Sequence, residues 1–80
     1  MECEVIKQLI EGRLAESEVE VTGDGRHFEA TVICDQFAGK GLIKQHQLVY
    51  GVIKAEMADD SIHALSLKTF TRETWQRANS

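Results

Sequence analysis

Residues 18–34, EVEVTGDGRHFEATVIC, decide how the chain folds. The stretch begins with alternating acidic and apolar residues, and this period of two is typical of a half-buried strand. Gly23-Asp24-Gly25 then predicts a tight turn, because glycine accepts positive φ and Asp-Gly favours hairpins. His27 to Cys34 follows as the second strand of an antiparallel hairpin. Phe28, Ala30, Val32 and Cys34 line one of its faces, and His27, Glu29, Thr31 and Ile33 line the other.

Helical patterns flank the hairpin on both sides. Apolar residues recur at helical spacing before it, at Val5, Ile6, Leu9, Ile10 and Leu14. A second helical pattern begins at Leu42, and its apolar stripe runs through Leu42, His46, Val49, Ile53 and Met57, with Ile43 and Tyr50 beside it. Gly51 inside this pattern indicates either a break between two short helices or a close packing contact. Residues 62–70 predict a third strand, after which Thr71 caps a short final helix anchored by Trp75.

The predicted order is therefore α-β-β-α-α-β with a short helix at the end. About 27 residues separate the second strand from the third, which is ample for a helical crossover, and such crossovers join parallel strands. The fold class that follows is α+β, a three-stranded mixed sheet with helices on one face. The sheet positions expected to face those helices are Val19, Val21, Phe28, Ala30, Val32, Leu65 and Leu67.

Length and composition indicate one small globular domain over residues 1–80. The chain is 42% hydrophobic and 28% charged, and it contains no proline. No apolar run approaches the ~18 residues that span a membrane, and the acidic N-terminus is unlike a signal peptide. The two cysteines, Cys3 and Cys34, form no C-x-x-C pair. We therefore expect a cytoplasmic protein without a disulfide framework.

The charge is unevenly distributed. The net charge is −4, with −5 on residues 1–40 and +1 on residues 41–80. This acidic balance argues against a protein that binds nucleic acid through a broad basic surface. It leaves room for a local basic strip around Lys40, Lys44 and His46.

The three histidines are the candidate metal or acid–base groups. His46 falls on an apolar helical stripe, where a packed structural histidine is the commoner case. His27 and His63 open the second and third strands, and parallel strands start at the same edge of a sheet, which would bring the two residues close. Strict alternation points their rings to opposite faces, unless the turn or a bulge re-aims His27. A two-histidine site therefore stays open.

Catalytic signatures are missing from the sequence. It contains no G-x-S-x-G, no H-E-x-x-H, no Walker A motif and no G-x-G-x-x-G. We therefore expect a protein that is not an enzyme.

Three segments resemble the BolA family. Phe37-Ala38-Gly39 with Lys44-Gln45-His46-Gln47-Leu48-Val49-Tyr50 is similar to its F-x-G…R-H-R-x-V-Y signature. Residues 62–75, IHALSLKTFTRETW, closely resemble its I-H-A-L-S-L-K-T-[YF]-T-P-E-x-W segment. The short hairpin at residues 23–28 looks like that of the IbaG-like bacterial subgroup.

The resemblance implies a fold similar to class II KH domains and a role in iron–sulfur assembly and iron homeostasis. Members pair with monothiol glutaredoxins and share a [2Fe–2S] cluster with the partner and its glutathione. The shared ligand of the family matches His63, and a second ligand comes from the hairpin. Here the hairpin has no cysteine, so His27 is the candidate. Phe70 and Trp75 are the expected partner-binding residues.

The resemblance also implies an alternative function, a KH-like DNA-binding regulator of the stress response. The residues expected to contact DNA are Lys40, Lys44 and His46. Gln45 and Gln47 stand where the family has two arginines, which weakens phosphate binding. Gly39-Lys40-Gly41 is one residue short of the G-x-x-G clamp of KH domains.

Overall fold

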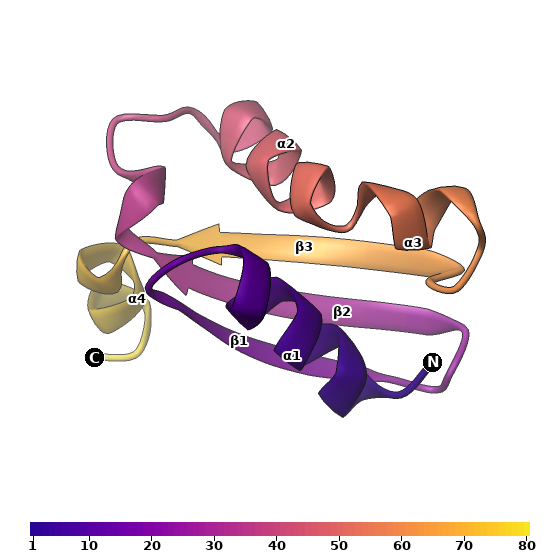
Figure 1. Ribbon diagram of the computed structural model, residues 1–80. Coiled ribbons are helices and arrows are strands. Elements are labelled where there is room, and N and C mark those ends of the chain that lie inside the picture. The colour runs from indigo at the N-terminus through magenta and orange to yellow at the C-terminus, as the bar shows by residue number, and fades with distance from the viewer.

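The computed structural model describes residues 1–80 as a three-stranded sheet with four α-helices and one 3-10 helix (Figure 1). Their bounds are α1 (Cys3–Arg13), β1 (Ser17–Gly23), β2 (His27–Cys34), η1 (Asp35–Phe37), α2 (Leu42–Val52), α3 (Lys54–Ala58), β3 (Ala64–Phe70) and α4 (Arg72–Ala78). The predicted order and the bounds of the second strand are confirmed. None of these helices combines the length and the apolar character needed to cross a membrane.

The sheet has the strand order β1-β2-β3, so β2 is its centre. β1 pairs with β2 antiparallel, and β2 pairs with β3 parallel. The parallel register places His27 opposite Ala64 at one end and Ile33 opposite Phe70 at the other. The predicted mixed sheet is thus confirmed, and the amino ends of β2 and β3 lie together.

One core fills the space between the sheet and helices α1, α2 and α3. Its fully buried members come from every layer and include Ile6, Ile10, Val32, Phe37, Val49, Ile53 and Ile62. Of the predicted inward positions, Val19, Phe28, Ala30, Val32 and Leu65 are buried, and Val21 and Leu67 pack against the cluster half-buried. The apolar face read from alternation is therefore the core face.

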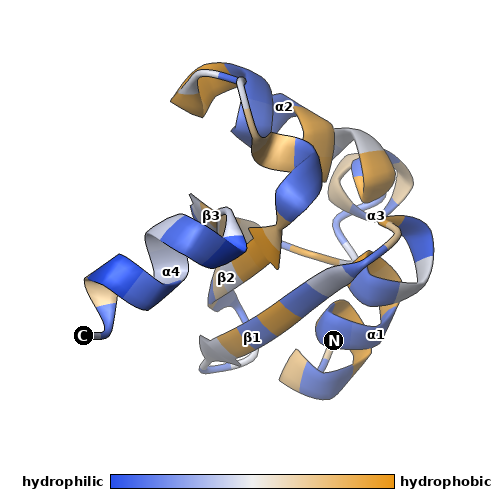
Figure 2. Ribbon diagram, turned by 90° about the vertical axis from the view of Figure 1, so that its left-hand side faces the viewer, coloured by the Kyte–Doolittle hydropathy of each residue, from blue (hydrophilic) through white to orange (hydrophobic).

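The fourth helix lies on the other side of the sheet. Figure 2 shows α4 across the sheet from α1 and α3, and it contacts β2 and β3. Trp75 meets Phe70 edge to face with ring centroids 5.2 Å apart. Ile33 lies on the face opposite the predicted core face, and it is buried because α4 covers this end of the sheet. The prediction that the helices cover one face of the sheet is therefore correct for α1, α2 and α3. The fourth helix, α4, covers part of the opposite face.

A carboxylate fixes the start of α4. Thr71 caps the helix as predicted and accepts from the Thr74 amide. Arg72 occupies the first helical position, where proline is favoured because its missing N–H needs no partner. The Arg72 amide instead donates to Asp35 Oδ1 at 3.0 Å, and the guanidinium lies 3.4 Å from Asp35 Oδ2. Asp35 thus accepts a hydrogen bond from the backbone N–H that Arg72 has and that a proline would lack.

The apolar stripe of α2 begins in a helical turn that lies beyond the end of the sheet. Gln45 already accepts a hydrogen bond from the Thr69 hydroxyl, one residue before the end of β3. The preceding turn therefore overhangs the sheet, and Leu42 and Ile43 are 61% and 74% exposed. Leu42 thus belongs to the predicted stripe without being buried, since helical period does not report where the sheet ends. The break between α2 and α3 falls at Ile53 rather than Gly51.

Side chains from the helices bond the two edges of the sheet. Glu11 of α1 accepts from the Val19 amide of β1 at 3.0 Å and from Lys7 Nζ at 2.8 Å. Tyr50 of α2 donates to the Leu65 carbonyl of β3 at 2.8 Å. The hydrogen bond from Lys7, followed by that from Val19, lowers the pKa of the Glu11 carboxyl. Each edge strand is thereby tied to the helix above it.

We predict that Glu11→Gln lowers stability at neutral pH by on the order of 0.5–1 kcal/mol. A lowered pKa means that the carboxylate stabilises the fold above its ordinary pKa of 4.5. This contribution is lost as the pH falls through the lowered folded value. Urea unfolding should therefore show a deficit at pH 7 that disappears near pH 3. Glu4→Gln, whose side chain bonds only Gln8 on the same helix at 3.4 Å, is the control. An equal deficit at both pH values would contradict the prediction.

Candidate functional site

Two of the three histidines meet at the amino ends of β2 and β3. His27 is the first residue of β2, and His63 directly precedes β3. Their ring centroids lie 6.1 Å apart with an interplanar angle of 78°, an edge-to-face contact. The predicted proximity of His27 and His63 is therefore found in the structure.

Strict alternation, which would point the two rings to opposite faces, does not govern this pair. Alternation applies only inside a strand, and β3 begins at Ala64, one residue after His63. The Ala64 amide donates to the Arg26 carbonyl at 3.2 Å, which ties the entry to β3 to the hairpin turn. His63 therefore approaches His27 from the loop, free of the pleat that orients Leu65.

Both rings of the pair are exposed, and one carboxylate stands beside them. Asp24 Oδ1 accepts from the amides of Arg26 and His27, each at 2.9 Å. Asp24 Oδ2 lies 3.8 Å from His27 Nδ1. The amide bond from His27, followed by that from Arg26, lowers the pKa of the Asp24 carboxyl. Asp24 is thus a carboxylate at neutral pH that holds the turn and faces the imidazole.

The two histidines do not form a complete metal site within this chain. No group of three or more His, Cys, Asp and Glu residues could hold a metal ion. Cys34 is buried, and its Sγ lies 3.6 Å from the Ala15 carbonyl rather than near the histidines. Two exposed imidazoles can donate to one iron of a cluster, and the remaining positions need thiolates from elsewhere. The donors fit a shared centre and do not fit a centre held by this chain alone.

His46 is separate from this pair. It is half-buried on α2, and its Nε2 is enclosed without a hydrogen-bond partner. An imidazole nitrogen enclosed in this way cannot reach a ligand at the surface. The packed, structural interpretation of His46 is therefore the one that the geometry favours.

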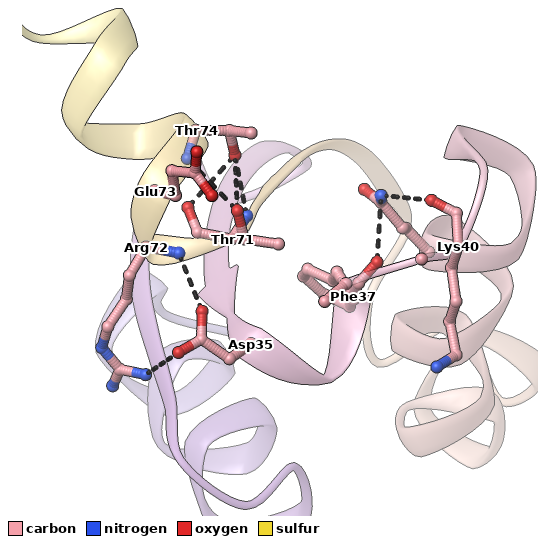
Figure 3. Close-up of a pocket in the computed structure, with 10 residues that line it drawn as sticks. Asp35, Phe37, Lys40, Thr71, Arg72, Glu73 and Thr74 are labelled. Carbon is pink, nitrogen blue, oxygen red and sulfur yellow. Dashed lines mark hydrogen bonds and ion pairs between the residues drawn. The ribbon is translucent and has the colours of Figure 1, made fainter.

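A cleft of about 520 Å³ lies at the opposite, carboxyl ends of β2 and β3 (Figure 3). It is lined by Asp35, Phe37, Ala38, Gly39, Lys40, Gln45, Thr71, Arg72, Glu73 and Thr74. The carboxylates of Asp35 and Glu73 balance the positive charges of Lys40 and Arg72 in this lining, so the cleft carries no net positive charge. The sequence reading missed this cleft, although the Gly39–Gly41 loop and the Thr71 cap both follow strands that end together.

The residues expected to contact DNA differ in accessibility. Lys40 Nζ donates to the Gln36 carbonyl at 2.8 Å. Lys44 is exposed and forms no ion pair, and it stands beside the exposed Leu42 and Ile43. Neither lysine forms an ion pair, and Lys44 differs from Lys40 in that its ammonium forms no hydrogen bond within the chain.

The residues expected to bind a partner lie far from the histidine pair. Phe70 ends β3, whereas His63 precedes its start, and strand geometry separates these ends by roughly 20 Å. Phe70 and Trp75 are half-buried against each other. A partner that touches both regions must cover the length of β3. The partner-binding role of Phe70 and Trp75 stays a prediction.

Comparison with known proteins gives a consistent picture. The chain matches the family model of BolA-like proteins over residues 5–74. It is 38% identical over 77 residues to the acid stress protein IbaG of Escherichia coli K12, covering 96% of this chain and 92% of IbaG. It is 39% identical over 57 residues to the DNA-binding transcriptional regulator BolA of Vibrio cholerae, covering 71% of this chain and 53% of the regulator. A BolA protein homologue from Coxiella burnetii superposes with a TM-score of 0.89 at 45% identity, covering 95% and 97% of the two chains.

We predict that Trp75→Ala weakens the fold without changing the histidine pair. Loss of the half-buried indole should lower the free energy of unfolding by about 1–2 kcal/mol. The ring-proton NMR shifts of His27 and His63 should stay unchanged, because the pair lies at the other end of β3. Gln76→Ala, an exposed change in the same helix, is the control. A Trp75→Ala protein as stable as this control would contradict the packing role.

Proposed function

The chain belongs to the BolA family, and we propose that it is an accessory protein that pairs with a monothiol glutaredoxin to bind or transfer a [2Fe–2S] cluster. The observation that carries the proposal is the exposed pair of His27 and His63, 6.1 Å apart at one end of the sheet. The cluster is cargo shared between two proteins rather than a resident cofactor.

The chemistry of the pair supports this role. Imidazole can replace thiolate on one iron of a [2Fe–2S] cluster, which raises the reduction potential. A neutral imidazole binds metal and a protonated one does not, so the bond is reversible. The chain offers two such donors, and neither cysteine joins them in a group that could hold a metal ion. The glutaredoxin and its glutathione would supply the sulfur ligands.

The position of the pair supports a docking site for the proposed partner at one end of the sheet. His27 opens β2 and His63 precedes β3, so the glutaredoxin would approach the β1–β2 turn and the amino ends of these strands. Phe70 and Trp75 would join the contact only if the partner also covered the outer face of the sheet. The proposal therefore centres on the histidine end.

The proposed role is binding and release rather than catalysis. The imidazoles would act as ligands, and no covalent bond of the chain forms or breaks. We propose the cytoplasm as the compartment, since a monothiol partner with glutathione requires reducing conditions.

We predict that His63→Ala abolishes the mixed cluster. The chain is mixed with a monothiol glutaredoxin, glutathione, iron and sulfide, and the visible absorption and circular dichroism are compared with those of the glutaredoxin alone. The wild-type chain should give a heterodimer with a distinct spectrum. His63→Ala should leave the spectrum of the glutaredoxin homodimer.

Lys44→Ala is the matched control and should behave as the wild type, because Lys44 lies in the first turn of α2, near the carboxyl end of β3 and away from the histidines. An unchanged heterodimer spectrum with His63→Ala would remove His63 from the ligand set. His27→Ala tests the second ligand in the same way, and we expect a weaker, more easily lost cluster.

We propose DNA binding as a second candidate function, in a regulator of the stress response. Two observations favour it: the unpaired Lys44 beside exposed Leu42 and Ile43, and the similarity to the Vibrio cholerae regulator. The balanced charge of the neighbouring cleft, the bonded Lys40 and the enclosed His46 count against a strong contact. Any binding of DNA would therefore rest on few phosphate contacts.

We predict that binding to a defined DNA duplex has a shallow salt dependence, with a slope of log Kd against log salt of about 1–2. Fluorescence anisotropy between 25 and 200 mM salt measures this slope, and Lys44→Ala should reduce it by about 1. His63→Ala should leave DNA binding unchanged. Binding that Lys44→Ala does not weaken would contradict a role for this surface.

A further inference from the structure

Asp24 uses its two carboxylate oxygens in different ways. Oδ1 accepts from the amides of Arg26 and His27, each at 2.9 Å, which closes the turn between β1 and β2. Oδ2 is not used by the turn and faces His27 Nδ1 at 3.8 Å. The turn itself requires only one acceptor, which an amide or a hydroxyl could also provide. The second oxygen is therefore free to act on the imidazole.

The neighbouring carboxylate distinguishes the two ring nitrogens of His27. A neutral imidazole carries its proton on one nitrogen and a lone pair on the other. A proton on Nδ1 is attracted by the Asp24 carboxylate, whose Oδ2 lies 3.8 Å away, an electrostatic contact that is longer than a hydrogen bond. The lone pair is then on Nε2. A carboxylate that holds a histidine in this way fixes its tautomer and raises its basicity as a ligand.

His63 is fixed by different contacts. The backbone bond from the Ala64 amide to the Arg26 carbonyl holds the loop before β3 against the turn. The ring of His63 then rests edge-on against His27, with centroids 6.1 Å apart. Neither contact is made by the Asp24 side chain. A change at Asp24 should therefore affect His27 and leave His63 in place.

We propose that Asp24 is the positioning residue of the histidine pair: it holds His27 in the Nδ1–H tautomer and so presents Nε2 as the metal donor. This inference rests on the proposed function for the identity of the cargo. The selection of the tautomer is a property of the chain itself and can be measured without metal or partner.

The test is the tautomer of His27 in the metal-free, 15N-labelled chain. Long-range 1H–15N NMR spectra at pH 8, where imidazoles are neutral, identify the protonated nitrogen. We expect His27 of the wild type to be mainly Nδ1–H. Asp24→Asn keeps an oxygen for the two amides but presents an NH₂ donor to Nδ1, so His27 should change to mainly Nε2–H. His63 should keep its own tautomer.

Asp24→Ser is the second variant, because its hydroxyl can accept for the turn and is too short to reach the ring. Asp24→Ser should shift the His27 tautomer in the same direction, and it keeps the test valid even where Asp24→Asn disturbs the turn. A wild-type His27 that is mainly Nε2–H would overturn the proposal. So would a tautomer that neither substitution changes.

The cluster provides a second, separable readout. In the heterodimer with a monothiol glutaredoxin, Asp24→Asn should speed loss of the cluster to a chelator by about 10-fold, the lower end of the effect of such a partner on metal affinity. An Asp24→Asn cluster as durable as the wild type would overturn the positioning role and leave the proposed function standing. A wild-type chain that forms no mixed cluster would contradict the proposed function, whereas the tautomer result would still decide whether Asp24 orients His27.

Discussion

The hydrogen bonds that pair β2 with β3 in parallel join two segments separated by η1, α2 and α3. This pairing forces the chain to cross over the sheet, and the crossover supplies Val49 and Ile53 to the core. It also gives the sheet two different ends. The amino ends of the strands bring His27 to His63, and the carboxyl ends bring Asp35 to the start of α4. Loss of this register would remove both arrangements together.

The sequence predicted those features that depend on short-range pattern. Alternation in residues 18–34 located the hairpin and its core face, and the length of the following segment indicated a parallel crossover. Contacts between distant segments were predicted only in part: the proximity of His27 and His63 was expected, and the cleft at the carboxyl ends of β2 and β3 was not. Helical period grouped the exposed Leu42 with the buried Val49 and Ile53, because it carries no information on where β3 ends. Alternation misdirected His63 because that residue lies outside the strand. The contact of the two rings depends on the parallel register of β2 and β3, from which the sequence predicted the nearness of the residues but not the direction of the rings.

The proposed function would account for the small donor set of the chain. Two exposed imidazoles would bind a metal weakly alone, and thiolates from the proposed partner would complete the site. No core residue takes part in this arrangement, since both rings are at the surface and all buried residues are apolar. The pair is therefore presented by a rigid sheet edge while the fold is stabilised independently of it.

Pulsed electron paramagnetic resonance of the reduced heterodimer tests the histidine half-site most directly. Only this chain would carry 15N-labelled histidine, and the glutaredoxin and glutathione would be unlabelled. The account predicts strong 15N hyperfine couplings from imidazole bound to one iron of the cluster. A reduced cluster with no 15N coupling from this chain would contradict it.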